Sequence, residues 1–433
     1  MNCLEKDNIP AGYKDSAVGI IPQEWEVKPF KNLGTFLRSN TLSREHMNNV
    51  EGLALNIHYG DVLVRYGEIL DCSKTAIPWV NNSCRETRLG DRLQNGDIVI
   101  SDTAEDYTVG KATEVCNVGN NCVLSGLHTM AFRPPKETFA LRYLGYYFNS
   151  PAYRAQLYSL IQGIKVCSIS KSAISNTYIP VPPMEEQRKI AEILGVWDEA
   201  IEKQSRLIER LELRKRALMQ RLLSGRTRLP GFTTPWQKIK LGEICEEYIL
   251  RNTEDNNYIV LSCTKYNGLV SSLDYFGKQI FSDNLRTYKV VPKYHFAYAT
   301  NHIEEGSIGY QGCYDYALIS PMYTVFKTDD KKVDNYFLYR LLKTPLMIYN
   351  YQSRIEGSID RRGGLRWDAF AGITIKLPSL PEQKAIAEVL TAADNEIATH
   401  RKKLDALRLQ KRGLMQQLLT GITRVKNQET LKH

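Results

Sequence analysis

The chain has 433 residues, 43% of them hydrophobic and 24% charged, which is typical of a globular protein with two or three domains. Its net charge of +9 favours an anionic partner such as nucleic acid, although many basic proteins bind none. The nine cysteines include no CxxC pair, which argues against a zinc or disulfide framework, and no apolar run of about 18 residues predicts a membrane span.

Residues 1–180 form the first predicted domain. The segment Met1–Tyr13 is polar and lacks the apolar core of a signal peptide, so we expect a cytoplasmic protein with free thiols. Short β-like runs follow at Asp61–Val64 and Asp97–Ile100, and a helix is expected near Leu141–Leu157. These elements predict a module of mixed α+β topology.

Residues 181–225 form the first of two predicted long helices. Apolar residues recur in alternating steps of four and three over more than four heptads, which indicates a coiled-coil seam rather than a simple amphipathic helix. Gly225 stands where a left-handed helix cap would fall. The apolar seam positions are Ile190, Leu194, Trp197, Ile201, Ile208, Leu211, Leu218 and Leu222, and Gln204 and Lys215 interrupt them.

Residues 226–376 form a linker and a second predicted domain. The linker from Arg226 to Trp236 contains a Pro-Gly pair, which is typical of a turn. The module resembles the first in its mixture of elements but not in its sequence. Its predicted elements are β-like runs at Tyr258–Leu261 and Thr287–Val291 and a helical stretch at Asn335–Leu346.

Residues 377–421 repeat the first long helix, and residues 422–433 form a polar tail. Val181–Arg228 reappears as Leu377–Arg424, 196 positions later and without a gap, with almost half of the positions identical. The second seam consists of Ile386, Leu390, Ile397, Leu404, Leu407, Leu414 and Leu418, with polar interruptions at His400 and Lys411. We therefore expect an α+β fold in which two globular domains are separated by two long helices that pair as an antiparallel coiled coil.

The two seam lysines test this pairing. If the helices run antiparallel about a pseudo-twofold axis, Lys215 faces the neighbourhood of Ala393, and Lys411 faces that of Trp197 and could make a cation–π contact there. The alternative is that both lysines reach out to solvent from a loosened seam.

The sequence contains no GxxxxGK[ST] phosphate loop, no GxSxG or HExxH motif, and no Asn-Pro-Pro-aromatic or Asp-Pro-Pro-aromatic motif of amino-methyltransferases. We therefore expect a non-catalytic chain that binds no cofactor or metal itself.

Basic loops recur before both long helices. Lys165 and Lys171 precede the first long helix, and Arg361, Arg362 and Arg366 precede the second. Arginine forks bind phosphates or guanine edges, although a solvated charged turn has the same composition. Further candidates for DNA contacts are Lys111, Lys265, Tyr266, Asn267 and Arg286.

The repeated segments carry a family resemblance. Ile179–Gln187 runs into Ile190-Ala191-Glu192 and is followed by Leu218–Gly225; both parts recur at Ile375–Gln383 and Leu414–Gly421. In this pattern the chain resembles the specificity (S, or HsdS) subunits of type I restriction-modification systems. Within the modules, Asn56–Asp61 and Gly306–Gly309 are also similar to that family's target-recognition domains.

The resemblance implies a role in DNA methylation and phage defence. Each target-recognition domain would read half of a bipartite site in double-stranded DNA, and the helices would set the spacing and dock two modification (methyltransferase) subunits. Restriction (translocase and nuclease) subunits would join them, and S-adenosylmethionine, ATP and Mg would bind those partners rather than this chain. Two alternatives remain open: a coiled-coil scaffold with two protein-binding modules, and a nuclease or methyltransferase in its own right.

Overall fold

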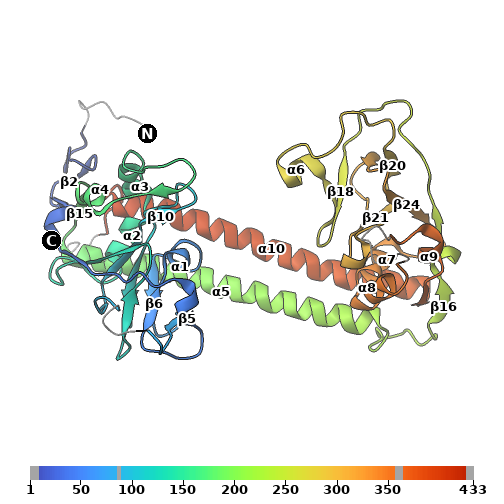
Figure 1. Cartoon of the computed structure of the whole chain (residues 1–433), viewed down its shortest axis with the longest axis horizontal. Coiled ribbons are helices and arrows are strands. Elements are labelled where there is room, and N and C mark those ends of the chain that lie inside the picture. Colours follow the sequence, from blue (N-terminus) through green and yellow to red (C-terminus); the bar gives the residue numbers. More distant parts are fainter. Residues whose placement is uncertain (1–8, 85–88, 356–363, 426–433) are drawn as a thin grey trace, which may run out of the picture. The chain divides into compact units, whose positions relative to one another are not determined.

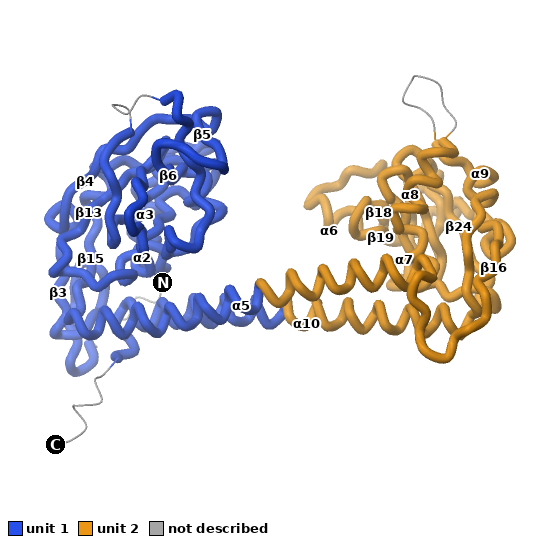
Figure 2. Tube along the Cα trace, turned by 90° about the horizontal axis from the view of Figure 1, so that it is seen from below, with its two compact units in different colours: residues 1–205, 402–433 blue, residues 206–401 orange. Residues whose placement is uncertain are grey.

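The computed structural model describes residues 9–84, 89–355 and 364–425. The chain divides into two compact units (Figure 2): unit 1 contains residues 1–205 and 402–433, and unit 2 contains residues 206–401. Two unbroken helices, α5 (Met184–Leu223) and α10 (Leu380–Leu419), each contribute one part to either unit. Each module therefore shares a unit with the beginning of one long helix and the end of the other. No helix among the described residues is long and apolar enough to cross a membrane.

Unit 1 is built on two sheets of short strands (Figure 1). Most neighbouring strands are antiparallel, but β11 pairs with β7 and β12 with β6 in parallel. The first sheet has the order β4 (Thr35–Leu37), β13 (Thr129–Arg133), β9 (Ile98–Ser101), β11 (Ala112–Cys116) and β7 (Ile69–Asp71). The second has the order β12 (Val123–Ser125), β6 (Leu55–Ile57), β8 (Trp79–Val80) and β5 (Met47–Asn48).

Smaller elements of unit 1 surround these sheets. They include three short strand pairs, β1 (Tyr13–Lys14) with β2 (Ile21–Pro22), β10 (Thr103–Ala104) with β14 (Cys167–Ser168), and β3 (Glu26–Pro29) with β15 (Tyr178–Val181). The short helices are α1 (Tyr59–Val64), α2 (Tyr143–Phe148), α3 (Pro151–Leu157) and α4 (Lys171–Ser175).

In unit 2, outside residues 356–363, the structure has one four-stranded sheet and three strand pairs. The sheet has the order β17 (Cys245–Glu247), β24 (Tyr323–Thr328), β21 (Phe296–Ala299) and β22 (Ile308–Tyr310). The pairs are β16 (Gln237–Lys240) with β25 (Thr374–Leu377), β18 (Leu261–Thr264) with β19 (Gly268–Ser271), and β20 (Lys289–Pro292) with β23 (Tyr316–Ile319). The short helices are α6 (Ser272–Phe276), α7 (Asn335–Leu342), α8 (Pro345–Gln352) and α9 (Trp367–Ala371).

Both modules are joined to the long helices in the same way. The strand that leads into each long helix pairs with a strand near the start of its module, so Ile179 lies opposite Lys28 and Ile375 lies opposite Ile239. Each hydrophobic core also takes residues from both long helices: Ile190 and Leu418 in unit 1, and residues such as Leu222, Leu223, Ile386 and Leu390 in unit 2. Burial of these side chains stabilises each unit by about 25 cal/mol per Å² of apolar surface removed from water. The ends of both long helices are therefore part of the core of each unit.

Several predicted elements are confirmed and one is wrong. The runs Asp97–Ile100 and Thr287–Val291 fall on β9 and β20, whereas the strand expected at Tyr258–Leu261 begins only at Leu261. Asp61–Val64 belongs to helix α1 instead of a strand. The reason is local: the His58 ring accepts the N–H of Gly60 at 3.3 Å, and its carbonyl accepts the N–H groups of Asp61 and Val62, which starts a helical turn.

The two predicted helical stretches within the modules are each split by a proline. Pro151 begins α3 and Pro345 begins α8, and both helices start with a side-chain cap, from Ser150 and Thr344 respectively. Proline fits the first turn of a helix but cannot continue the preceding one, so each stretch becomes two short helices. The break falls at the same place in both modules. The modules are therefore related in structure, although their sequences have diverged too far to show it.

Candidate DNA interface and helix contacts

The long helices pair antiparallel within each unit, as the repeat predicted. In unit 1, Lys411 Nζ lies 2.5 Å from Asp198 Oδ1. In unit 2, Arg401 Nη2 lies 2.5 Å from Glu212 Oε1, and Arg214 is paired with Glu396. Residue numbers rise along one helix as they fall along the other. All of the predicted seam residues are buried or half-buried.

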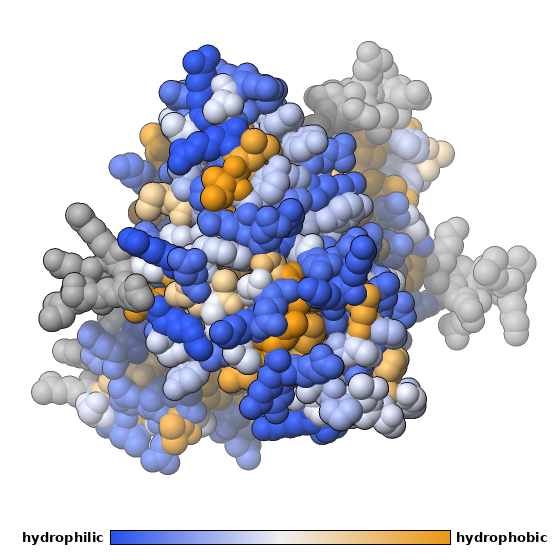
Figure 3. Space-filling view, turned by 90° about the vertical axis from the view of Figure 1, so that its right-hand side faces the viewer, coloured by the Kyte–Doolittle hydropathy of each residue, from blue (hydrophilic) through white to orange (hydrophobic). Residues whose placement is uncertain are grey.

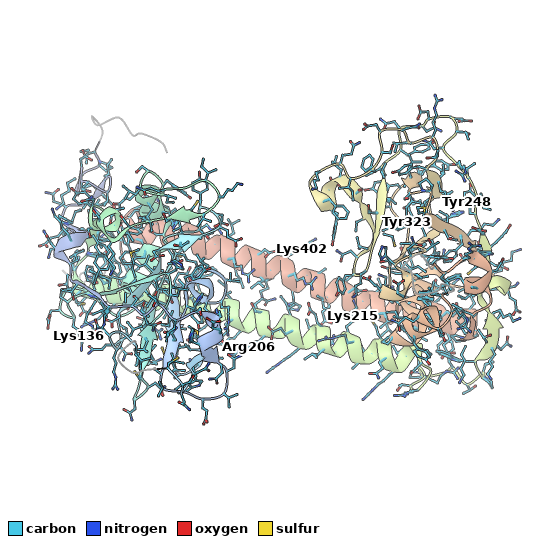
Figure 4. The ribbon with its side chains drawn as sticks, in the orientation of Figure 1. Lys136, Arg206, Lys215, Tyr248, Tyr323 and Lys402 are labelled. Carbon is cyan, nitrogen blue, oxygen red and sulfur yellow. The ribbon has the colours of Figure 1, made fainter. Side chains whose placement is uncertain are left out.

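The two seam lysines are paired with aspartates of the opposite helix. Lys215 on α5 (Figure 4) contacts Asp394, next to the predicted Ala393. Lys411 contacts Asp198, next to Trp197, but the aromatic ring beneath its ammonium is that of Tyr146, 5.1 Å away. The predicted cation–π contact with Trp197 is therefore wrong, because Tyr146 comes from the module and its place could not be read from the helix repeat.

A buried glutamate joins the start of each long helix to the segment that follows the other. In unit 1, Glu186 accepts hydrogen bonds from the Trp25 indole at 2.9 Å and from Arg424 Nε at 2.8 Å. In unit 2, Glu382 accepts from Arg228 Nε at 2.5 Å and Nη2 at 2.6 Å. The two arginines and the two glutamates occupy equivalent positions of the repeat. Charge-assisted pairs of this kind are strong when the carboxylate is buried.

The glutamine after each of these glutamates attaches the module to the helix. Gln187 accepts the N–H of Ala140 at 2.9 Å and donates to the carbonyls of Thr138 and Pro182. Gln383 accepts the N–H of Asp334 at 2.9 Å and donates to the carbonyls of Lys332 and Pro378. The repeated Glu-Gln motif therefore has a physical role as a connector, since both amides satisfy buried backbone groups.

Two of the unit 1 candidates for DNA contact are exposed and one is not. Lys165 lies on the loop before β14, and Lys171 opens α4 with its Nζ 5.2 Å from the centre of the Phe36 ring. Lys111 donates to the carbonyl of Leu63 at 2.9 Å, and burial lowers the pKa of its ammonium. Lys111 thus holds the end of α1, and a direct DNA contact is better sought at Lys165 and Lys171.

Unit 2 gathers three of its candidates in one turn. Lys265, Tyr266 and Asn267 form the exposed tip of the β18–β19 hairpin, and the Tyr266 side chain is 80% exposed. Lys343 Nζ donates to the carbonyl of Lys265 at 2.8 Å, which adds a second cation near the tip. An exposed phenol beside two ammonium groups is suited to donating a hydrogen bond to a phosphate or a base edge of a duplex while phosphates are neutralised.

The other unit 2 candidates are separate from this tip in the chain. Arg286 is exposed and lies 3.3 Å from Asp255, and Arg366 is exposed at the start of α9. Arg361 and Arg362 lie outside the described residues. The face of the molecule in Figure 3 is mostly hydrophilic, with separate hydrophobic areas between polar ones.

One cationic pair in unit 1 was missed by the sequence analysis. Arg44 and Arg65 lie 2.6 Å and 3.2 Å from the same carboxylate oxygen of Asp61, whose side chain is 1% exposed. Both arginines are about half-exposed. Asp61 and Arg65 have the i,i+4 spacing of a helical ion pair, but only the fold brings Arg44 to the same carboxylate.

Comparison with known proteins identifies the family. The model of the type I restriction modification DNA specificity domain matches residues 66–213 and 234–409. In Methanocaldococcus jannaschii, a relative assigned to the type I restriction enzyme MjaX as its specificity subunit is 25% identical, over 96% of this chain and 97% of the relative. The MjaVIII specificity subunit of the same organism is 27% identical over 63% of this chain and 68% of its own.

The fold agrees with a solved structure. A chain from work on complex assembly and conformational transition of the type I R-M system superposes with a TM-score of 0.59 at 16% identity, covering 93% of this chain and 99% of that one. Since the family model covers most of the chain, including large parts of both modules and most of both long helices, this chain belongs to the type I restriction-modification DNA specificity family.

Proposed function

We propose that this chain reads a bipartite site in double-stranded DNA and brings modification subunits to it, without catalysing a reaction itself. The observation that carries the proposal is the repeated connection between module and helix. Glu186-Gln187 and Glu382-Gln383 make the same kinds of contact in the two units, although the modules that they hold differ in sequence and sheet topology. Two modules that differ in sequence but are attached to the helices by the same contacts fit a single scaffold that presents two domains with different DNA sequence preferences.

The exposed basic loops supply the DNA contacts in this proposal. Lys165 and Lys171 would contact the first half-site, and Lys265, Tyr266, Asn267 and Arg366 the second. Lysine and arginine neutralise phosphates and position the protein, whereas side chains that hydrogen-bond to base edges distinguish bases. Arg361 and Arg362 remain candidates for the second half-site.

The helices supply the spacing. Each has 40 residues without a break, and at about 1.5 Å per residue such a helix is about 60 Å long. A helix of fixed length permits only certain gaps between half-sites, because B-DNA also rotates by one turn in about 34–36 Å. Insertion of one heptad into both helices should therefore change the accepted gap and leave the sequences of the half-sites unchanged.

The direct test is co-expression of this chain with its presumed modification subunit, followed by mapping of methylated adenines across the host genome. A split motif that disappears when the chain is omitted is the expected result. Methylation by the purified chain alone would instead favour the alternative of an enzyme, and a stable complex without any new methylation would favour the scaffold.

We further propose that two modification subunits dock on the long helices, one in each unit. In unit 1, a cavity of about 550 Å³ lies between α3 and the last part of α10, and Leu409, which lines it, is 67% exposed. In unit 2, the repeat-related Leu213 is 58% exposed, and Leu346 on α8 is 68% exposed. Exposed apolar side chains at matching positions fit two copies of one protein partner.

The stoichiometry of the complex tests this docking. Leu409→Asp and Leu213→Asp should each reduce the number of bound modification subunits from two to one, and the double variant should bind none. Val196→Asp, at a residue of α5 that is 63% exposed, is the matched control. Two bound subunits in the double variant would place the docking surface elsewhere.

A further inference from the structure

The ammonium group of Lys411 lies where four elements of unit 1 meet. Lys411 belongs to α10 and is 5% exposed at a seam position where the heptad pattern calls for an apolar residue. Its Nζ lies 2.5 Å from Asp198 Oδ1 on α5 and 2.9 Å from Glu68 Oε2, in the turn between α1 and β7. The ring of Tyr146 on α2 lies 5.1 Å away. Two of these partners belong to the module and one to the opposite helix.

The module side of this cluster is itself firmly held. The carbonyl of Glu68 accepts the N–H of Glu114 at 2.9 Å, and Glu114 lies in β11 of the larger sheet. The Tyr146 hydroxyl donates to Asp198 Oδ2 at 2.5 Å. A continuous set of hydrogen bonds therefore runs from the sheet through Glu68 to Lys411, and from Asp198 back to α2.

The cluster is charged. Burial lowers the pKa of Lys411, but Glu68 and Asp198 outweigh this effect and hold the pKa above its ordinary value. A buried ion pair often contributes little net stability relative to apolar residues of similar size, because desolvation offsets the attraction. Its hydrogen bonds are directional, however, whereas apolar contacts allow neighbouring elements to slide or tilt. Such a cluster is therefore better suited to fixing an orientation than to stabilising the fold.

Unit 2 has a related but different arrangement at the same place. Lys215 contacts Asp394, and Arg340 of α7 lies 2.5 Å from the other oxygen of that carboxylate. Arg340 and Tyr146 occupy the same place, because each stands five residues before the proline that opens the next helix. The aspartate is thus bonded to the module in both units, but by a cation in one and a phenol in the other.

We propose that Lys411, together with Glu68 and Asp198, is a positioning residue that sets the angle of the first module on the helices and so determines which gap between half-sites is accepted. The inference rests on the proposed function, since it concerns how the two half-sites are read together. The side chains proposed for DNA contact in this module, Lys165 and Lys171, are not in the cluster, so recognition of each half-site is expected to be independent of it.

The test uses the full chain co-expressed with the modification subunit and a library of sites in which the gap is shortened or lengthened by one or two base pairs. Lys411→Met keeps the length of the side chain but removes its charge. In this variant the preference for the wild-type gap over its neighbours should fall at least tenfold, with both half-site sequences unchanged. Lys402→Met, at an exposed lysine of the same helix (Figure 4), is the control and should keep the wild-type preference.

Glu68→Gln is the second variant, because it removes one charge of the cluster without changing its size. It should relax the gap preference in the same direction as Lys411→Met. Unchanged gap preference in a folded Lys411→Met complex overturns the inference, and so does unfolding of both variants, which would indicate a purely structural role. If the wild-type complex methylates no split site, the result contradicts the proposed function itself, and the inference about Lys411 no longer applies.

Discussion

The guanidinium of Arg424 lies 2.8 Å from Glu186 although the two residues are 238 positions apart in the sequence. Arg424 follows α10, Glu186 stands in the first turn of α5, and the Trp25 indole donates to the same carboxylate. The equivalent pair in unit 2, Arg228 and Glu382, is separated by only 154 positions and is joined through the linker. The same kind of contact therefore closes both units. In unit 2 it is made by Arg228 of the linker, and in unit 1 it is made by Trp25 and Arg424, which lie near the two ends of the chain.

Arg424→Ala should destabilise unit 1. Glu186 is 6% exposed, and loss of its cationic partner leaves a buried carboxylate held mainly by the indole. Breaking a buried pair costs about 3 kcal/mol, which denaturant unfolding measures directly. Arg188→Ala is the control, because Arg188 and its partner Glu185 are both 62% exposed, and it should cost less than about 1 kcal/mol. Equal costs for the two variants would contradict this account.

Two helix-capping glycines should differ in their tolerance of alanine. Gly225 and Gly421 both adopt left-handed conformations, with φ of 69° and 73°, so alanine is strained by about 1 kcal/mol at either. A Cβ on Gly225 would lie 3.4 Å from the Trp236 ring, whereas one on Gly421 would lie 2.4 Å from Pro22. Gly421→Ala should therefore lower the melting temperature clearly more than Gly225→Ala. The reverse order would show that the segment around Pro22 moves aside easily.

Glu114 should make the protein less stable as the pH rises from 5 to 8. Burial raises its pKa from 4.5 to about 7, although the N–H groups of Arg142 and Gly145 favour the carboxylate. Between these two values the unfolded chain has released the proton that the folded chain still holds, so folding becomes less favourable with increasing pH. The full difference is about 3 kcal/mol.

Glu114→Gln separates this contribution from that of the other titrating groups. The difference in unfolding free energy between the variant and the wild type should shift in favour of the variant by up to about 3 kcal/mol between pH 5 and pH 8. A difference that does not depend on pH would show that Glu114 titrates normally in the folded protein.

Lysine and tyrosine at the β18–β19 tip should affect DNA binding in different ways. Lys265→Ala should reduce the slope of log affinity against log salt by about 0.9, because one phosphate contact is lost. Tyr266→Ala should lower affinity for the second half-site by roughly tenfold and leave the slope unchanged, because a hydrogen bond from a neutral hydroxyl releases no counterion. The half-buried Lys293 and the exposed Tyr294 form a similar pair, with Nζ 5.6 Å from the ring centre, and substitutions there are the control. Equal effects at the two pairs would remove the hairpin tip from the proposed interface.

The sequence alone was sufficient for the two long helices and their seams, whereas their antiparallel pairing was a hypothesis that the contacts of Lys215 and Lys411 confirm. These features depend on apolar residues that recur along the chain with a fixed period and on a second copy that confirms the first. The family resemblance rests on the same repeated residues. The Glu-Gln motif was visible as a pattern, but its function as a connector became clear only from its contacts with Ala140 and Asp334.

The tertiary structure decided the features that depend on residues distant in the chain. Apolar composition favoured a strand at Asp61–Val64, but the cap at His58 makes it a helix. The polar interruption at Lys411 was evident in the heptads, whereas its partners Glu68 and Tyr146 lie in loops and helices that no periodicity connects to it. Periodic patterns determine local elements and their pairing, and only the folded chain brings together the isolated charges that hold a module on its helices.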